Sequence, residues 1–213
     1  MVHTKSQAPR GRKTAAELLG VMAAPRNARD RIVQTAIDLF YAHGFVAVGL
    51  DRILDEVGVT KTTFYKHFES KDALVLTAVR ERDAWERQAW DRAVHALAGD
   101  DARAQLLAMF DVLDAWFNDP EFHGCMFINA AAEFPNPNDP VHKAAAEHKR
   151  HARDSVRDTA ARARVRDPEA FADAYTMIFE GTLVLRQVHD RDDAARLARP
   201  VVERLIEQHM PAA

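Results

Sequence analysis

The sequence predicts an all-α protein with a small N-terminal domain and a larger helical domain after it. Apolar residues recur at spacings of three and four along most of its 213 residues, which is the pattern of amphipathic helices. No segment alternates polar and apolar residues as a half-buried strand does. Glycine and proline fall between the periodic segments, as in 99–101 and 135–140, and so they mark where helices end.

Composition indicates a globular protein of the cytoplasm. A chain of 213 residues can form one or two domains with a buried core. The single cysteine, Cys125, excludes an internal disulfide, which fits a reducing compartment. No apolar run approaches the roughly 18 residues of a membrane span, and the N-terminus lacks the order of a signal peptide. We therefore expect a cytoplasmic protein with no membrane partner.

Residues 1–26 are predicted to be a basic tail. Its early basic residues are Lys5, Arg10, Arg12 and Lys13. A short helix can form over Thr14–Met22, because Thr14 and Glu17 have the spacing of a capping box. The tail has two interpretations, a basic arm that reaches the minor groove or the phosphates of DNA and a solvated extension.

Residues 27–74 are predicted to be a three-helix domain. The first helix is expected over Ala28–His43 and the second over Leu50–Val57. Gly49 precedes the second helix and can cap it only weakly. Gly58 can adopt the left-handed conformation that ends it. A helix, a tight glycine turn and a further helix together form a helix-turn-helix unit.

The third helix of this domain is predicted over Thr60–Phe68. At about 100° per residue, Phe64 and Phe68 share one face, which suits a core. The outer face carries Thr62, Thr63, Tyr65 and Lys66. It offers hydrogen bonds to base edges and phosphates, and it has no carboxylate to repel them.

Two lysines also favour DNA binding. Lys61 follows the expected cap Thr60, and Lys71 follows the expected cap Ser70. A cation in the first turn opposes the helix dipole, whereas a phosphate there would be attracted by the free N–H groups and by the lysine. The alternative is that both lysines only solvate the surface.

The charge is distributed unevenly along the chain. The net charge is −3. Residues 1–75 hold eleven Lys and Arg against eight Asp and Glu, a balance of +3, and the remainder carries −6. A positive N-terminal part is expected of a module that meets DNA.

The segment Ala28–Leu74 resembles the DNA-binding domain of the tetracycline-repressor (TetR) family. The matching residues are Arg31-Ile32, Ala36, Leu39-Phe40, Gly44-Phe45, Ile53, Gly58-Val59-Thr60-Lys61, Phe64-Tyr65, His67-Phe68 and Ser70-Lys71-Asp72-Ala73-Leu74. The resemblance implies that the third helix enters the major groove. The sequence departs from the family at Val48-Gly49, where a hydroxyl pair is common. The residues expected at the DNA are Gly49, Thr60, Lys61, Thr62, Thr63, Tyr65, Lys66, His67 and Lys71.

Residues 75–213 are predicted to form a ligand-binding and dimerisation domain. The fourth helix, which Ser70 caps, is expected over Lys71–Ala98. Further helices are expected over Ala102–Asn118, Gly124–Phe134, Val141–Val165, Pro168–His189 and Asp192–His209. The helix 141–165 is so charged that we expect it to be solvated, with little apolar stripe. Pro200 should kink the last helix or mark its true start.

The last two helices are the candidates for homodimerisation. The residues expected at the interface are Tyr175, Ile178, Gly181, Leu185, Val201 and Leu205. The family resemblance implies a four-helix bundle between two copies. The alternative is that both helices only complete the core of the monomer, because periodicity does not separate the two cases.

Aromatic residues and methionines concentrate in 102–134. The residues expected to bind a ligand are Trp85, Met109, Leu113, Trp116, Phe117, Met126, Asn129, Glu133 and Met177. Filling a core is the commoner use of such side chains, but they also line apolar pockets. Asn129 and Glu133 share one face, and burial of an unpaired carboxylate is costly. That face is therefore at the surface, paired within the protein or turned to a ligand, and we expect a small apolar or aromatic inducer.

Other constellations are weaker. Glu147, His148 and His151 lie within one turn, but no cysteine cluster or HExxH motif accompanies them, so we expect surface histidines and no metal. Cys125 lies in an apolar run, where cysteine behaves as a small hydrophobe. The sequence shows no catalytic set and no phosphate or dinucleotide loop, so we expect neither an enzyme nor a cofactor.

These features predict a homodimeric transcriptional repressor that a small molecule releases from a palindromic operator. One alternative is a ligand-independent, architectural DNA-binding protein of the same fold. A second is an all-α enzyme with an incidental helix-turn-helix.

Overall fold

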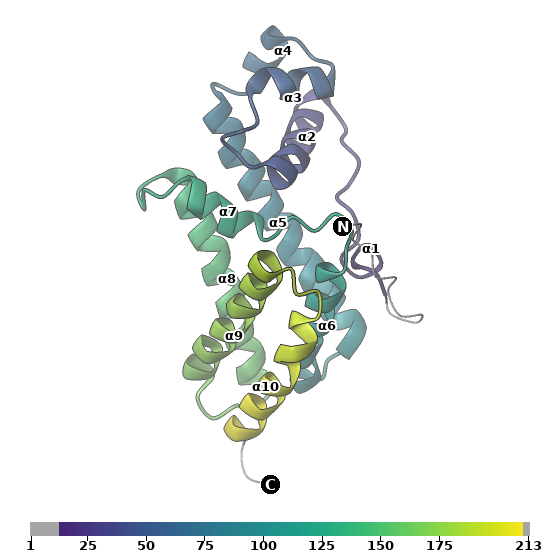
Figure 1. Cartoon of the computed structure of the whole chain (residues 1–213), viewed down its shortest axis with the longest axis vertical. Coiled ribbons are helices and arrows are strands. Elements are labelled where there is room, and N and C mark those ends of the chain that lie inside the picture. The colour runs from purple at the N-terminus through teal and green to yellow at the C-terminus, as the bar shows by residue number, and fades with distance from the viewer. Residues whose placement is uncertain (1–12, 211–213) are drawn as a thin grey trace.

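The computed structural model describes residues 13–210, which fold as an elongated set of helices (Figure 1). The helices are α1 (Ala15–Leu19), α2 (Ala28–His43), α3 (Leu50–Val57), α4 (Lys61–Tyr65), α5 (Lys71–Ala98), α6 (Ala102–Phe117), α7 (Met126–Glu133), α8 (Pro140–Arg162), α9 (Pro168–His189) and α10 (Ala194–His209). No strand occurs in this range, so the predicted all-α class is confirmed. None of these helices is long and apolar enough to cross a membrane.

The helices α2, α3 and α4 form one end of the molecule, and α5 runs from them into the larger domain (Figure 1). The predicted bounds of α2 and α3 are correct. Asn27 caps α2 by accepting a hydrogen bond from the Asp30 N–H at 2.9 Å. Gly58 ends α3 in the left-handed region with φ 72°, and Gly49 caps α3 without a side-chain bond.

The helix α4 is shorter than predicted. It covers Lys61–Tyr65 rather than 60–68, and Thr60 is its cap. Beyond Tyr65 the chain turns, with both His67 N and Phe68 N donating to the Phe64 carbonyl at 2.8 and 3.0 Å. The turn keeps Phe64 and Phe68 together in the core with ring centroids 5.5 Å apart, so the predicted inner face survives.

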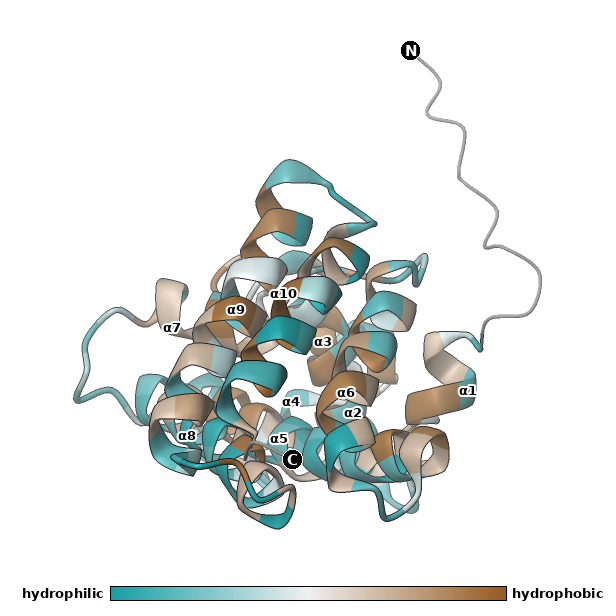
Figure 2. Ribbon diagram, turned by 90° about the horizontal axis from the view of Figure 1, so that it is seen from below, coloured by the Kyte–Doolittle hydropathy of each residue, from teal (hydrophilic) through white to brown (hydrophobic). Residues whose placement is uncertain are grey.

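One hydrophobic core extends through both domains. It runs from Ile32 and Phe40 in α2, through Leu74 and Val79 in α5, to Ile206 in α10. Because α5 contributes to both ends of this core, the helix-turn-helix unit is packed against the larger domain and not merely linked to it. Figure 2 views the molecule along its long axis and shows hydrophobic and hydrophilic segments alternating along α6 and α9.

The expectation that residues 141–165 form a solvated helix is wrong. The helix α8 packs against α5, α6, α7 and α9. Its inner stripe consists mainly of small residues, and the buried ones include Ala144, Ala145, Val156, Thr159 and Ala160, together with the larger His148. Alanine allows neighbouring helices to approach closely. A stripe of alanines is hard to recognise in the sequence, because the bulky apolar residues that usually mark a buried face are few. The charged residues of α8 lie around this stripe.

Part of the predicted tail belongs to the larger domain. The capping box of α1 is confirmed, because Glu17 N donates to Thr14 Oγ1 at 3.2 Å and Thr14 N donates to Glu17 Oε2 at 2.7 Å. Ala15 and Leu19 are buried in a second apolar cluster with residues of α5 and α6, which we call the α1 cluster. Of the early basic residues in the tail, Lys5, Arg10 and Arg12 lie outside the described residues and Lys13 lies within them.

Pro200 lies within α10, six residues after the helix begins at Ala194. It therefore does not mark the start of that helix. The segments before and after it continue as one helical element.

Candidate nucleic-acid interface and ligand cavity

The outer face of α4 is open to solvent. Phe64 is fully buried, whereas the next residue, Tyr65, is 57% exposed. Lys61, Thr62, Lys66 and His67 are also exposed. This surface lies at the end of the molecule farthest from α10 (Figure 1), so a DNA duplex can approach it without meeting the larger domain.

Two side chains of this face already interact with other residues of the protein. Thr63 is half-buried; its N–H donates to Thr60 Oγ1 at 3.2 Å, and the two hydroxyl oxygens lie 3.1 Å apart. Lys61 forms an ion pair with Asp51 of α3 at 2.8 Å, and the hydrogen bond to Asp51 raises the pKa of Lys61. Thr62, on the other hand, keeps an exposed hydroxyl.

Lys71 is held in a way that the sequence did not indicate. Its side chain is half-buried, and Nζ donates to the Phe45 carbonyl at 2.8 Å. The ammonium also lies 6.0 Å from the centroid of the Phe40 ring. Contact of Lys71 with a phosphate stays a prediction, and this ammonium already has a partner in the loop between α2 and α3.

A cavity of about 710 Å³ lies among α5, α6, α8 and α9. One wall is aromatic: Trp90 makes edge-to-face contacts with Trp116 and Phe179 at centroid distances of 6.4 and 5.8 Å. Met109 adds to this wall. Met109 and Trp116 are the two expected ligand-binding residues that the cavity brings together.

The other expected ligand-binding residues lie elsewhere. Leu113, Phe117 and Met126 are buried in the core. Trp85 packs with the α1 cluster, and Met177 is 73% exposed on α9. These placements differ from the prediction because aromatic composition does not show which side of a helix faces a cavity and which side faces the core.

The predicted Asn129 and Glu133 pair is also absent from the cavity. Asn129 Oδ1 accepts a hydrogen bond from Gln187 Nε2 at 2.8 Å. Glu133 accepts hydrogen bonds from the N–H groups of Phe45 and Val46. Of the three possibilities for this face, pairing within the protein is correct, and Glu133 is not available to orient a ligand.

The cavity has a polar side that the sequence analysis missed. Lys149 Nζ donates to both carboxylate oxygens of Glu180 at 2.8 and 2.9 Å, and these two residues line the cavity together with Glu86 and His148. The sequence predicts a solvated helix here, because the partners of Lys149 and His148 are far away in the sequence and the helix alone does not reveal them.

His148 is a buried residue, not the expected surface histidine. It is 8% exposed, its ring stacks on Phe127 at 3.5 Å, and its Nδ1 lies 2.8 Å from Asp83 Oδ1. Burial alone would raise the pKa of Asp83, but the hydrogen bond and charge of His148 outweigh it, so the pKa is lowered. Among residues 13–210 no group of three potential metal ligands gathers.

Cys125 also lines the cavity. It is 3% exposed, and burial raises the pKa of its thiol although Lys149 acts in the opposite direction. A neutral thiol in an apolar setting agrees with the interpretation of Cys125 as a small hydrophobe.

An apolar face remains uncovered on α9 and α10. Its exposed members are Met177, Val184, Leu185, Val188, Leu197 and Val201. The prediction that Tyr175 lies at the interface is wrong, because Tyr175 is fully buried and its hydroxyl donates to the Leu106 carbonyl at 2.7 Å. Ile178 and Leu205 are half-buried, and Gly181 is exposed. Contiguous exposed apolar residues of this kind are typical of protein interfaces.

A helix-turn-helix unit packed through one long helix onto a domain with a ligand-sized cavity defines the class of one-component transcriptional regulators. Comparison with known proteins agrees with this class. Residues 32–78 match the family described as bacterial regulatory proteins, tetR family, and residues 102–202 match the tetracyclin repressor-like C-terminal domain. The chain belongs to the TetR family of DNA-binding transcriptional regulators, and the regulators of this family are not enzymes.

Individual relatives support the assignment. The HTH-type transcriptional regulator YjdC of Escherichia coli is 26% identical over 182 residues, which cover 82% of this chain and 93% of the relative. The crystal structure of SCO4454, a TetR-family transcriptional regulator from Streptomyces coelicolor, is 31% identical and has a TM-score of 0.79; the match covers 86% of this chain and 96% of that one. Escherichia coli NemR in its reduced form shares the fold, with 18% identity, coverage of 84% and 96%, and a TM-score of 0.76.

Proposed function

We propose that this regulator is a cytoplasmic, homodimeric repressor that leaves its operator when a small molecule fills the cavity among α5, α6, α8 and α9. The observation that carries the proposal is this 710 Å³ cavity, in a domain that shares one core with the helix-turn-helix unit. An architectural DNA-binding protein of the same fold would have no use for such a cavity. A filled core in the larger domain would have favoured that alternative.

The proposed mechanism follows from symmetry. Two copies joined through α9 and α10 place two α4 helices in successive major grooves, about 34–36 Å apart, on a near-palindromic site. A ligand that binds better to a conformer with a different spacing shifts the population toward that conformer. The operator is then released without any change in the residues that touch it.

The lining suggests an inducer with a flat aromatic body and polar substituents. The body would rest on Trp90, Trp116 and Phe179, and the substituents would meet His148 and the Lys149–Glu180 ion pair. The polar side revises our expectation of a largely apolar inducer. Selection of bound fragments from genomic DNA, followed by screening for compounds that release them, tests the proposal. A protein that selects no fragment would contradict it.

Lys66→Ala should weaken binding to all DNA sequences alike and lower the slope of log affinity against log salt by about one, as expected for one lost phosphate contact. Thr62→Ala should instead relax base preference, with a discrimination loss of about 1–3 kcal/mol at one position. Binding titrations at several salt concentrations separate the two effects. An unchanged salt slope in Lys66→Ala would show that this lysine does not contact a phosphate.

Trp116→Ala should raise the inducer concentration needed for release by at least about tenfold, the effect of losing one aromatic contact of about 1.4 kcal/mol. Its operator affinity without inducer should stay near that of the wild type. Trp85→Ala is the matched control, since Trp85 packs with the α1 cluster and does not line the cavity. Equal inducer responses in the two variants would place the inducer elsewhere.

A further inference from the structure

The loop between α2 and α3 is bound by a carboxylate from the larger domain. Phe45 N donates to Glu133 Oε1 at 3.0 Å, and Val46 N donates to Glu133 Oε2 at 2.7 Å. Both oxygens of one carboxylate therefore accept from successive backbone N–H groups. Hydrogen bonds to an ionised acceptor are shorter and about twice as strong as neutral ones.

Gly44 and Lys71 complete this arrangement. Gly44 has φ 84°, and a Cβ at this position would lie 2.9 Å from Glu133 Oε1, so a side chain here would displace the carboxylate. At Phe45, whose N–H donates to Glu133, the carbonyl oxygen accepts a hydrogen bond from Lys71 Nζ at 2.8 Å. The loop is thus held through its N–H groups by an anion and through its carbonyl by a cation.

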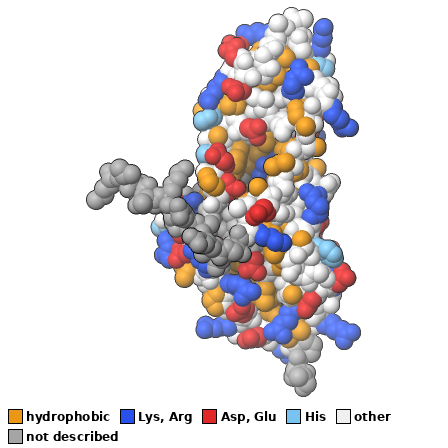
Figure 3. Space-filling view, turned by 90° about the vertical axis from the view of Figure 1, so that its right-hand side faces the viewer, with side chains coloured by type: hydrophobic (Ala, Val, Ile, Leu, Met, Phe, Trp, Pro, Cys, Tyr) orange, Lys and Arg blue, Asp and Glu red, His pale blue; other side chains and the backbone are white. Residues whose placement is uncertain are grey.

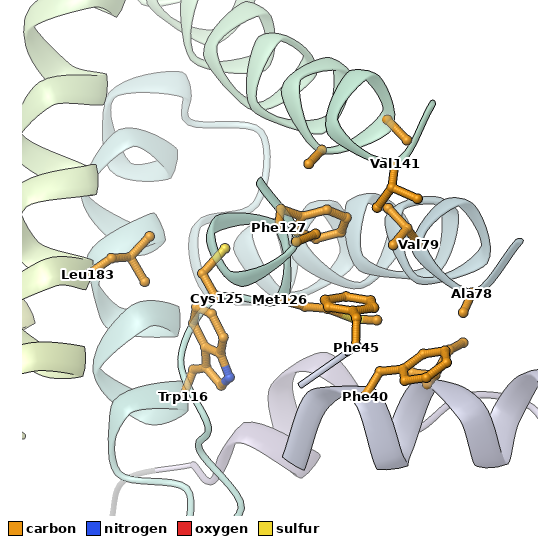
Figure 4. Packing of buried hydrophobic residues seen from close by; sticks show 14 of the residues in the cluster. Phe40, Phe45, Ala78, Val79, Trp116, Cys125, Met126, Phe127, Val141 and Leu183 are labelled. Atoms are coloured by element: carbon orange, nitrogen blue, oxygen red, sulfur yellow. The ribbon is translucent and has the colours of Figure 1, made fainter. Parts of the chain in front are cut away.

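Glu133 is the last residue of α7, and the other end of α7 is at the cavity. Cys125 caps this helix and lines the cavity, and Phe127 in its first turn stacks on the cavity residue His148. Eight residues at 1.5 Å each make a rod about 12 Å long. Figure 4 shows Trp116 and Cys125 toward one side of α7, and Phe40 and Phe45 toward the other.

We propose that Glu133 is a positioning residue for operator binding: its carboxylate fixes the loop between α2 and α3, and through it the orientation of α3 and α4 relative to the larger domain. The placement of α7 adds a second part, which rests on the proposed function. A ligand that moves His148 and Phe127 shifts α7 along its axis and pulls Glu133 away from the loop.

The first part can be tested without a ligand. In Glu133→Gln, one carboxylate oxygen becomes an NH₂ group, which faces an N–H donor instead of accepting from it. Amide hydrogen exchange at Phe45 and Val46 should accelerate by at least about tenfold, and operator affinity should fall by about tenfold, the usual effect of losing one hydrogen bond to a charged group. Glu147→Gln is the control, because Glu147 is exposed on α8 and its carboxylate lies 4.0 Å from His151 Nε2.

The outcomes separate a positioning role from a merely structural one. Faster exchange at Phe45 and Val46 together with weaker operator binding supports the proposal. Faster exchange with unchanged operator binding, or wild-type exchange at both amides, overturns it. If Glu133→Gln does not fold, Glu133→Asp keeps the charge, retracts it by one methylene and gives the same two readouts. Exchange at these amides requires neither operator nor inducer, so a failure to find an inducer overturns the repressor proposal and the second part, and leaves the positioning role of Glu133 standing.

Discussion

Leu185→Arg should convert the protein from a dimer to a monomer and weaken operator binding by at least about 100-fold, since a monomer loses the second half-site and with it the gain from bivalent binding. Leu185 is 44% exposed and lies on the uncovered face of α9, near Val188 and Val201, which are 71% and 49% exposed. A guanidinium buried in such a seam without a partner is strongly unfavourable. The monomer itself should remain folded, because the side chain points away from the core.

Sedimentation equilibrium at micromolar concentration measures the first effect, and operator titration measures the second. Leu97→Arg is the matched control, since Leu97 is 39% exposed at the far end of α5 and lies outside the α9 and α10 face. Leu205 is a poorer choice, because it packs against the core. A dimeric Leu185→Arg protein would show that the interface is elsewhere, and a monomeric wild type would remove the paired-site mechanism.

Phe64→Ala should lower the free energy of unfolding by about 3–5 kcal/mol, as for other large-to-small changes of a buried aromatic residue. Phe64 is fully buried in α4 and packs on Phe68 and Tyr65 at centroid distances of 5.5 and 5.2 Å. Natural domains have only about 5–15 kcal/mol in total. The melting temperature of the whole chain should therefore fall by roughly 10 °C, and the operator-binding surface should be lost first.

Tyr65→Ala is the neighbouring control. Tyr65 is 57% exposed, so its removal should leave the melting temperature nearly unchanged while it weakens DNA binding. Thermal melts should thus separate the two variants, whereas operator titrations should show weaker binding for both. Equal melting temperatures would contradict the assignment of Phe64 to the core and Tyr65 to the DNA.

The helix-turn-helix could be predicted closely because its signals are local. Gly58, the cap Thr60 and the pair Phe64 and Phe68 act within a few residues of one another, and the structure places all of them as expected. The end of α4 could not be predicted in this way. After Tyr65, His67 N and Phe68 N both donate to the Phe64 carbonyl, and the chain turns instead of continuing the helix. This turn brings Phe68 to the core.

The cavity could not be predicted because its polar side depends on partners that are distant in the sequence. Lys149 pairs with Glu180 and His148 pairs with Asp83, across gaps of 31 and 65 residues. Each looks like a surface charge when its own helix is considered alone. Glu133 posed the same difficulty: its carboxylate was correctly identified as needing a partner, but the partners are backbone N–H groups 88 and 87 residues earlier.

The docking of α1 gives the DNA-binding unit two covalent connections to the larger domain. One is α5, and the other is the segment 20–27, which runs from α1 on the larger domain up to α2 (Figure 1). Eight residues reach at most about 28 Å when fully extended, so this segment is a short tether. Figure 3 shows one face of the molecule, on which acidic and basic side chains are interspersed with apolar ones. A body held at one point can tilt in any direction, whereas a body held at two points turns most easily about the line that joins them. In the proposed dimer, we therefore expect the anchoring of α1 to favour a swing about one axis as the motion by which the two copies change their spacing.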